Sequence, residues 1–146
     1  MNKRAYVAVA AAAAMALSAS PASAKGVRYQ GKNGQGSSVS LRISPSTARG
    51  FTTSVGVLCV SVATGRSLRE IYPIAFKAPV QRKGKKFSFL FDGPSSTLVT
   101  VTGRVKGSKV TGSLKVQYNK TLGMTSTGLL DIGACSVKTT WSATAK

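Results

Sequence analysis

The sequence predicts an all-β protein, and three observations support this prediction. After residue 24 no stretch repeats apolar residues at the spacing of an amphipathic helix, whereas several runs alternate apolar and polar residues. Turn-forming residues recur about every 8 to 12 positions, as in sandwiches and barrels. Residues 97–118 form a hairpin pattern with little ambiguity. We expect a single antiparallel β-sandwich of about seven or eight strands, with a closed up-and-down β-barrel as the alternative.

The hairpin in residues 97–118 is predicted with its register. Its tip is Gly107-Ser108 between two alternating runs, which is typical of a two-residue type II′ turn. A slip by one residue would move every apolar side chain to the polar face, so the pattern specifies its own pairing. The expected pairs on the apolar face are Val105–Val110, Gly103–Gly112, Val101–Leu114, Val99–Val116 and Thr97–Tyr118.

Two glycines oppose each other on the buried face of this hairpin. Glycine weakens a strand, and it is often found where another group approaches the backbone closely. We therefore expect Gly103 and Gly112 to make room for a bulky side chain. Trp141 is the candidate, because it is the only tryptophan and it shares the inward parity of the last predicted strand.

Alternation predicts the remaining strands in residues 27–30, 39–43, 51–62, 68–76, 87–91 and 135–143, with a flexible loop over 31–36. Pro73 cannot donate to a sheet ladder and indicates an edge strand or a bulge. The even-numbered face of the third strand is also apolar towards its end, so we expect it to be covered on both sides. Residues 119–134 have no clear period; an irregular edge strand through Leu122, Met124, Leu129 and Ile132 is favoured over a functional loop.

Residues 1–24 are typical of a secretory signal peptide. Lys3 and Arg4 precede an alanine-rich apolar run over 5–17, and Ala22-Ser23-Ala24 supplies a small-residue cleavage site. The apolar run is shorter than the about 20 residues that span a bilayer. We expect residues 25–146 to be a single exported domain without a transmembrane segment, located outside the cell or in the cell envelope.

The charge of the chain favours anionic partners. It carries 21 basic and three acidic residues, and two of the basic residues precede residue 25, which leaves a net charge of +16 on residues 25–146. Such a charge attracts polyanions and opposes self-association, so we expect a monomer whose partner is an anionic polymer of the cell envelope or another polyanion.

Cys59 and Cys135 are the only cysteines, and both fall on apolar faces of predicted strands. In an exported chain such a pair indicates one disulfide, and the loop of 76 residues predicts a stabilisation of about 4 kcal/mol. The alternative is two free buried thiols or a redox pair, which the wide spacing and the lack of a C-x-x-C motif disfavour.

Few residues are suited to catalysis or to metal binding. The chain has no histidine, and its only acidic residues are Glu70, Asp92 and Asp131. A serine nucleophile would lack a histidine base, and zinc ligands of the usual kinds do not cluster in the sequence. We expect no enzymatic activity, no catalytic residues, no cofactor and no metal.

One dense cluster of cations, Arg82, Lys83, Lys85 and Lys86, falls in a predicted loop. It is either an anion-binding finger or a solvated loop whose charges protect the following strand from aggregation. No aromatic platform flanks it for base stacking, and the chain has no dedicated nucleic-acid motif.

The chain resembles a group of uncharacterised secreted all-β proteins of actinobacteria and related high-GC bacteria. The residues that carry the resemblance are Tyr29-Gln30-Gly31-Lys32, the strand over 39–43, Cys59, the basic hairpin over 103–112, Cys135 and Trp141-Ser142-Ala143. The resemblance implies an exported β domain and brings no known activity.

Together these observations predict an exported, non-enzymatic binding or envelope-associated protein with a basic surface for anionic polymers. The alternative is a β-barrel that binds a small ligand. A continuous apolar pocket inside the domain would favour the alternative.

Overall fold

The structure is a computed structural model that describes residues 25–146; the predicted signal peptide lies outside the described residues. The all-β prediction is confirmed. Within residues 25–146 no helix is long and apolar enough to cross a membrane. The strands are β1 (Val27–Asn33), β2 (Ser38–Ile43), β3 (Thr47–Ser61), β4 (Ser67–Phe76), β5 (Val80–Gln81), β6 (Lys86–Gly93), β7 (Thr97–Lys106), β8 (Lys109–Met124) and β9 (Leu130–Ala145).

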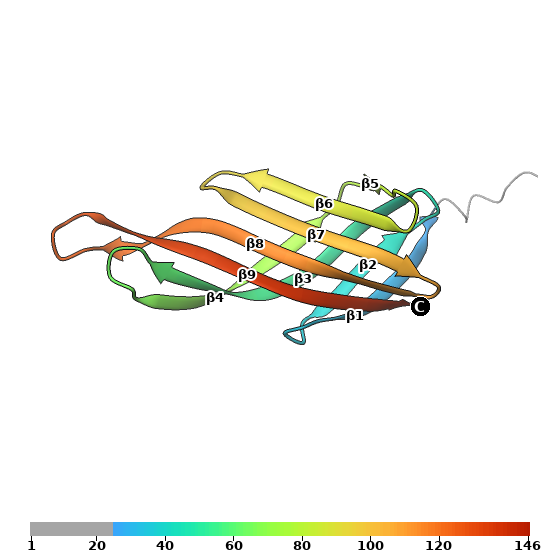
Figure 1. Cartoon of the computed structure of the whole chain (residues 1–146), viewed down its shortest axis with the longest axis horizontal. Helices are drawn as coiled ribbons and strands as arrows, with labels where there is room; N and C mark the ends of the chain where they lie inside the picture. Colours follow the sequence, from blue (N-terminus) through green and yellow to red (C-terminus); the bar gives the residue numbers. More distant parts are fainter. Residues whose placement is uncertain (1–24) are drawn as a thin grey trace, which may run out of the picture.

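The strands form one antiparallel sheet in the order β4-β3-β2-β1-β9-β8-β7-β6, with β5 attached to β3 (Figure 1). A further pairing between β3 and β9 closes a small ring of β1, β2, β3 and β9. The sequence favoured a sandwich of two sheets, with a closed barrel as the alternative. The closed ring in the structure is nearer to the barrel. The prediction that Pro73 marks an edge is confirmed, because β4 is a terminal strand of the sheet.

The register predicted for the central hairpin is confirmed. Strands β7 and β8 pair from Val105–Val110 through Gly103–Gly112 to Val99–Val116, and Gly107 adopts the positive φ of 58° that the turn requires.

Residues 119–134 form strands rather than a functional loop. Strand β8 continues to Met124 and β9 begins at Leu130, and the two remain paired almost to the tip. The favoured interpretation as an irregular edge strand is therefore right, because beyond Asn119 strand β8 pairs only with β9 and lies at a local edge of the sheet. A bulge between Thr121 and Gly123 shifts the register by one residue, which explains the missing period.

The expected flexible loop over 31–36 is wrong in part, because β1 continues to Asn33. Gly31 permits this extension, since a Cβ there would lie 1.9 Å from the carbonyl oxygen of Ser142 on β9. The short turn that follows is fixed to β3. The side-chain amide of Gln35 donates to the carbonyl oxygen of Gly56 at 3.0 Å and accepts from its backbone N–H at 2.7 Å. These two bonds resemble those that a neighbouring strand would make.

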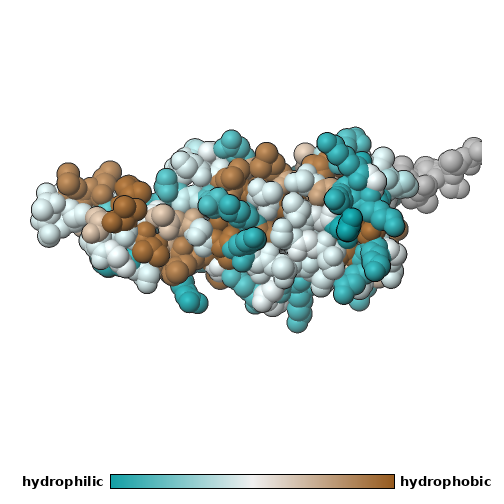
Figure 2. Space-filling view, in the orientation of Figure 1, coloured by the Kyte–Doolittle hydropathy of each residue, from teal (hydrophilic) through white to brown (hydrophobic). Residues whose placement is uncertain are grey.

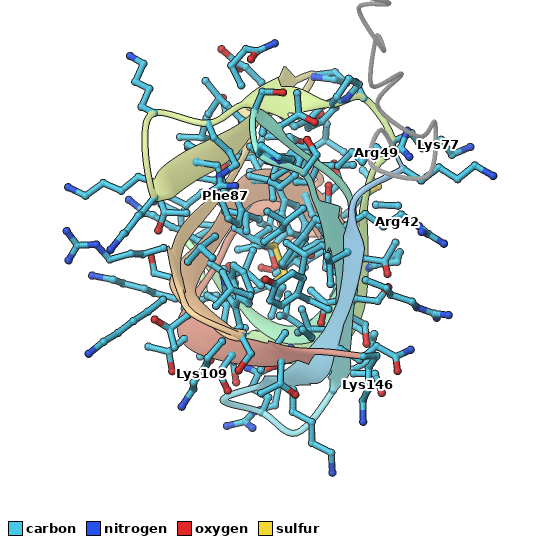
Figure 3. All side chains as sticks on the ribbon, turned by 90° about the vertical axis from the view of Figure 1, so that its right-hand side faces the viewer. Arg42, Arg49, Lys77, Phe87, Lys109 and Lys146 are labelled. Carbon is cyan, nitrogen blue, oxygen red and sulfur yellow. A yellow bond between two sulfur atoms is a disulfide. The ribbon has the colours of Figure 1, made fainter. Side chains whose placement is uncertain are left out.

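Aromatic side chains fill the interior at the end of the sheet where the β7–β8 turn lies. Trp141 packs edge-on against Phe51 at a ring-centroid distance of 5.1 Å, and Phe89 packs against both Phe51 and Phe87. Figure 3 looks along this interior, with cationic side chains such as Lys109 and Arg42 pointing away from it.

The two opposed glycines accommodate two rings. Trp141 lies over Gly112 and donates its indole N–H to the carbonyl oxygen of Thr102 at 3.1 Å, while Phe87 lies over Gly103. The expectation of a bulky neighbour is confirmed, but Trp141 occupies only the space over Gly112. The space over Gly103 is occupied by Phe87, which lies on β6, the strand that pairs with β7 on its other side.

The predicted disulfide between Cys59 and Cys135 is present, with an S–S distance of 2.03 Å. It joins directly opposed residues of β3 and β9 and is almost fully buried. A disulfide is compatible with an oxidising compartment.

The even-numbered face of β3 is not covered, contrary to the sequence expectation. Leu58, Val60 and Val62 are 42, 40 and 78% exposed. The sheet curls towards the odd-numbered face, so this second apolar face points outward.

Candidate functional site: the outer face of β6 to β9

Two grooves meet on the outer face of the sheet. The first, of about 570 Å³, crosses β6, β7 and β8, and the second, of about 580 Å³, crosses β8, β9 and β1. Both are lined by Thr111 and Gly112, so together they form one continuous track across five strands. Four strand spacings of about 4.8 Å make this track about 19 Å long.

Hydroxyl side chains line the track. The buried residues of each strand point inward, and the alternate positions therefore present short polar groups to solvent. Strand pairing places Ser88 beside Thr102, Thr102 beside Ser113, and Ser113 beside Thr140. The hydroxyl groups of Thr102 and Ser113 are 2.8 Å apart. Ser113 lies between Thr102 and Thr140, and the hydroxyl residues that line the two grooves are Ser88, Thr102, Thr111, Thr140 and Ser142.

Cations flank the hydroxyl groups at both ends of the track. Lys83, Lys86 and Arg104 line its β6–β7 end, and Lys32 lines its β1 end. Further exposed cations project from the same outer face. Figure 2 shows this face, with a pale area of intermediate hydropathy beside a strongly hydrophilic end. The additional cations are Lys106, Lys109, Lys115 and Lys138.

The structure divides the predicted cation cluster into two parts. Lys83 and Lys86 pair across a tight turn through Gly84, and with Lys85 they are exposed. Arg82 is half-buried and donates from its guanidinium to the carbonyl oxygen of Ser44 at 2.6 Å. Arg82 therefore holds the loop in place, while the lysines are the members that an anion could reach.

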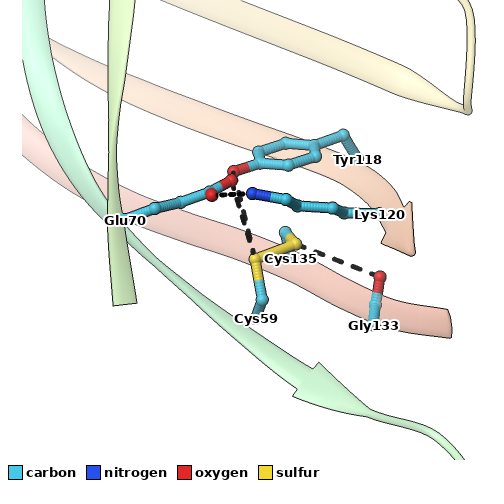
Figure 4. A network of polar contacts seen from close by, with 6 residues as sticks. All are labelled: Cys59, Glu70, Tyr118, Lys120, Gly133 and Cys135. Carbon is cyan, nitrogen blue, oxygen red and sulfur yellow. Dashed lines mark hydrogen bonds and ion pairs between the residues drawn. A yellow bond between two sulfur atoms is a disulfide. The ribbon is translucent and has the colours of Figure 1, made fainter. Parts of the chain in front are cut away.

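A second polar cluster lies inside the opposite end of the sheet, next to the disulfide (Figure 4). Glu70 on β4 accepts hydrogen bonds from the Tyr118 hydroxyl and from Lys120, both on β8. Lys120 and then Tyr118 hold the pKa of the Glu70 carboxyl below its ordinary value. Burial, followed by the hydrogen bond to Glu70, raises the pKa of Tyr118.

This second cluster is not a metal centre in the state described. Cys59, Glu70 and Cys135 place one potential ligand atom each within 4.8 Å of one another. Both sulfur atoms are joined in the disulfide, so neither is available as the thiolate that binds metals.

Asp131 is 3% exposed at the same end of the molecule and accepts a hydrogen bond from the Ser61 hydroxyl. The Ser61 oxygen in turn accepts from the backbone N–H and the hydroxyl of Thr64, both at 2.9 Å. These bonds give the buried carboxylate one donor and link it to the β3–β4 turn. The third acid, Asp92, is exposed on β6.

A smaller groove of about 210 Å³ lies between the two terminal strands of the sheet, β4 and β6. Tyr72, Phe76 and Phe91 contribute to its walls. Phe76 stacks on Phe89 at 5.1 Å, so aromatic rings bridge the gap between the strands.

Comparison of the chain with models of known protein families and with curated proteins gives no match. The resemblance to the secreted actinobacterial group stays a prediction.

The hydroxyl-lined track was not predicted from the sequence. Its residues are ordinary serines and threonines at alternating positions, and only the pairing of five strands brings them together. The predicted register of the β7–β8 hairpin already places Thr102 beside Ser113, so the central part of the track could have been found from the sequence.

Proposed function

We propose that the protein is an exported, non-enzymatic binding protein whose outer β6–β9 face holds an anionic polymer. The observation that carries the proposal is the continuous track of hydroxyl groups with cations at both ends. Hydroxyl groups donate hydrogen bonds to phosphate or carboxylate oxygens, and lysine and arginine supply the opposite charge. A track about 19 Å long accepts several units of a linear polymer.

The distribution of acids supports the same proposal. Glu70 is paired with Lys120, Asp131 is buried, and Asp92 lies on the strand at the edge of the sheet. Among residues 25–146, no acidic side chain lines either groove. A polyanion on the track is therefore attracted to the cations at both ends and meets no acidic side chain of the groove walls between them.

A binding titration with a soluble polyphosphate, repeated at several salt concentrations, tests the proposal. The variant Lys83→Ser/Lys86→Ser/Arg104→Ser removes three cations of the track and leaves Arg82 to hold the loop. The matched control, Arg28→Ser/Arg42→Ser/Lys77→Ser, removes the same charge from exposed positions outside the grooves. We expect the track variant to lower the slope of log affinity against log salt by about two to three units, and the control to lower it by less than about one.

Equal losses in the two variants would contradict the proposal, because net charge alone would then explain binding. A second variant separates charge from the hydroxyl groups. Replacing Thr102 and Ser113 by valine keeps every charge, and we expect it to weaken binding several-fold through lost hydrogen bonds, with little change in the salt slope.

A further inference from the structure

An apolar surface lies on the outer side of the sheet at the end opposite the β7–β8 turn. Val62 follows β3 and lies beside β9, since its N–H donates to the carbonyl oxygen of Ile132 at 3.1 Å. Met124 pairs with Leu130 across the β8–β9 hairpin. We call this surface the β3–β9 apolar face; its members, between 38 and 78% exposed, are Leu58, Val60, Val62, Met124, Leu130 and Ile132.

The six side chains form one connected surface. Strands β3 and β9 pair through Val60–Ala134 and Leu58–Ser136, so the even-numbered residues of both strands point to the same outer side. Figure 2 shows apolar side chains gathered at this end of the molecule. Large connected apolar surfaces are unusual on soluble monomers and often mark an interaction site.

The interior beneath this face contains polar groups beside the disulfide. Asp131 and Ser61 are buried there, and Glu70 with its two donors lies partly exposed at the border of the interior. At this end the sheet therefore has polar groups inside and apolar groups outside, which is the reverse of its other end. An apolar partner on the outer side would remove this exposed surface from water.

The charges around the face indicate what kind of partner it would bind. Arg69 lies opposite Leu58 on β4, Arg66 lies in the turn after Val62, and Lys138 follows on β9. All three are exposed, and the nearest acids, Glu70 and Asp131, point inward and are hydrogen-bonded. A second copy of the chain would bring like charges together, on a domain that already carries +16.

We propose that the β3–β9 apolar face seats the protein on an anionic phospholipid bilayer. The six apolar side chains enter the interface between headgroups and acyl chains, and the arginines and lysine at the rim contact lipid phosphates. Apolar area and electrostatic attraction both add to the affinity of such a surface for a membrane. Lys138 lies beside Lys115 on the outer face, between this site and the polymer track, and the proposal does not depend on the function of the track.

Vesicle flotation tests the proposal with two lipid compositions, phosphatidylcholine alone and phosphatidylcholine mixed with phosphatidylglycerol. We expect the protein to float with the mixed vesicles and only weakly with the neutral ones. The variant Val62→Ser/Leu130→Ser should bind the mixed vesicles about tenfold less, because two exposed apolar side chains are lost from the interface. The control Val27→Ser/Leu90→Ser removes two side chains that are 50 and 64% exposed outside this face, and it should bind like the unchanged protein.

A fluorescence measurement locates the contact without depending on affinity. The only tryptophan, Trp141, is 2% exposed near the opposite end of β9, so its emission should not respond to lipid. In the variant Met124→Trp we expect a blue-shifted emission on adding mixed vesicles and quenching by brominated acyl chains.

Three results would overturn the proposal. The first is a Val62→Ser/Leu130→Ser variant that unfolds at the same urea concentration as the unchanged protein and still floats equally well. The second is the absence of flotation with either composition. The third is a dimer in sedimentation that dissociates in this variant, which would assign the face to a second copy of the chain.

Discussion

The two ends of this sheet have opposite polarity. Where the β7–β8 turn lies, the rings of Phe51, Phe87, Phe89 and Trp141 fill the interior, and serines, threonines and cations cover the outside. At the β8–β9 tip, the interior holds buried carboxyl and hydroxyl groups beside the disulfide, and the outside is apolar.

This difference indicates that the two ends are stabilised by different means. Aromatic packing holds the first end, with glycines that allow rings to lie against the backbone. A covalent bond and hydrogen-bonded polar groups hold the second. The first end is suited to a hydrophilic, anionic partner and the second to an apolar one.

The largest expected effect comes from removing the disulfide. The variant Cys59→Ala/Cys135→Ala should lower the free energy of unfolding by about 4 kcal/mol, because the bond closes a loop of 76 residues in the unfolded chain. Urea unfolding under oxidising conditions measures this loss. A loss below about 1 kcal/mol would mean that the polar end does not depend on its covalent bond.

The two opposed glycines should differ in their response to alanine. A Cβ at Gly112 would lie 1.8 Å from the backbone oxygen of Thr102, whereas one at Gly103 would meet the ring of Phe87 at 2.2 Å. Backbone yields less than a side chain, so we expect a loss of about 3 kcal/mol for Gly112→Ala and about 1–2 kcal/mol for Gly103→Ala. Denaturant unfolding of both variants checks the order, and equal values would contradict the assigned contacts.

The Glu70 carboxylate should make the polar end sensitive to acid. Its pKa is lowered in the folded state, so its contribution is fully present above the ordinary value of 4.5 and is lost as pH falls through the folded-state value. The variant Glu70→Gln should cost about 1 kcal/mol at neutral pH and progressively less as pH falls below 4.5 towards the lowered folded-state pKa. Urea unfolding over a series of pH values from 7 downward measures the difference. A cost that does not change with pH would show that the carboxylate charge contributes nothing.

The smallest expected effect is a gain at the β6–β7 turn. Ser95 and Ser96 have φ values of 57° and 55°, in the left-handed region that glycine adopts more easily, and the N–H of Thr97 closes the turn on Pro94 at 3.1 Å. We expect Ser96→Gly to stabilise the protein by about 0.5–1 kcal/mol, measured as a higher urea midpoint. A lower midpoint would mean that the serine side chains contribute more than the backbone strain costs.

The sequence predicted what depends on local alternation. The β7–β8 register, the edge position of β4 and the inward placement of both cysteines follow from period-two patterns and from single residues such as Pro73. The β8–β9 hairpin was harder to predict because the bulge between Thr121 and Gly123 shifts the register and hides the alternation.

Features that depend on strand order could not be predicted in this way. The closure between β3 and β9 joins residues about 75 positions apart, so the alternation within either strand does not predict that the two strands pair. Curling of the sheet also leaves the second apolar face of β3 outside, where the sequence alone suggested a covered strand. The β3–β9 apolar face arises from this closure, whereas the polymer track arises from the pairing of β6, β7, β8, β9 and β1.

The central claim is that the two faces bind independently, and a bridging measurement tests it most directly. Vesicles of phosphatidylcholine and phosphatidylglycerol are loaded with the protein and mixed with fluorescently labelled polyphosphate. If the faces are separate, the label floats with the vesicles while the protein stays bound, and the Lys83→Ser/Lys86→Ser/Arg104→Ser variant floats but carries less label. Release of the protein from the vesicles by the polymer would show that lipid and polymer compete for one basic surface, and would contradict the account.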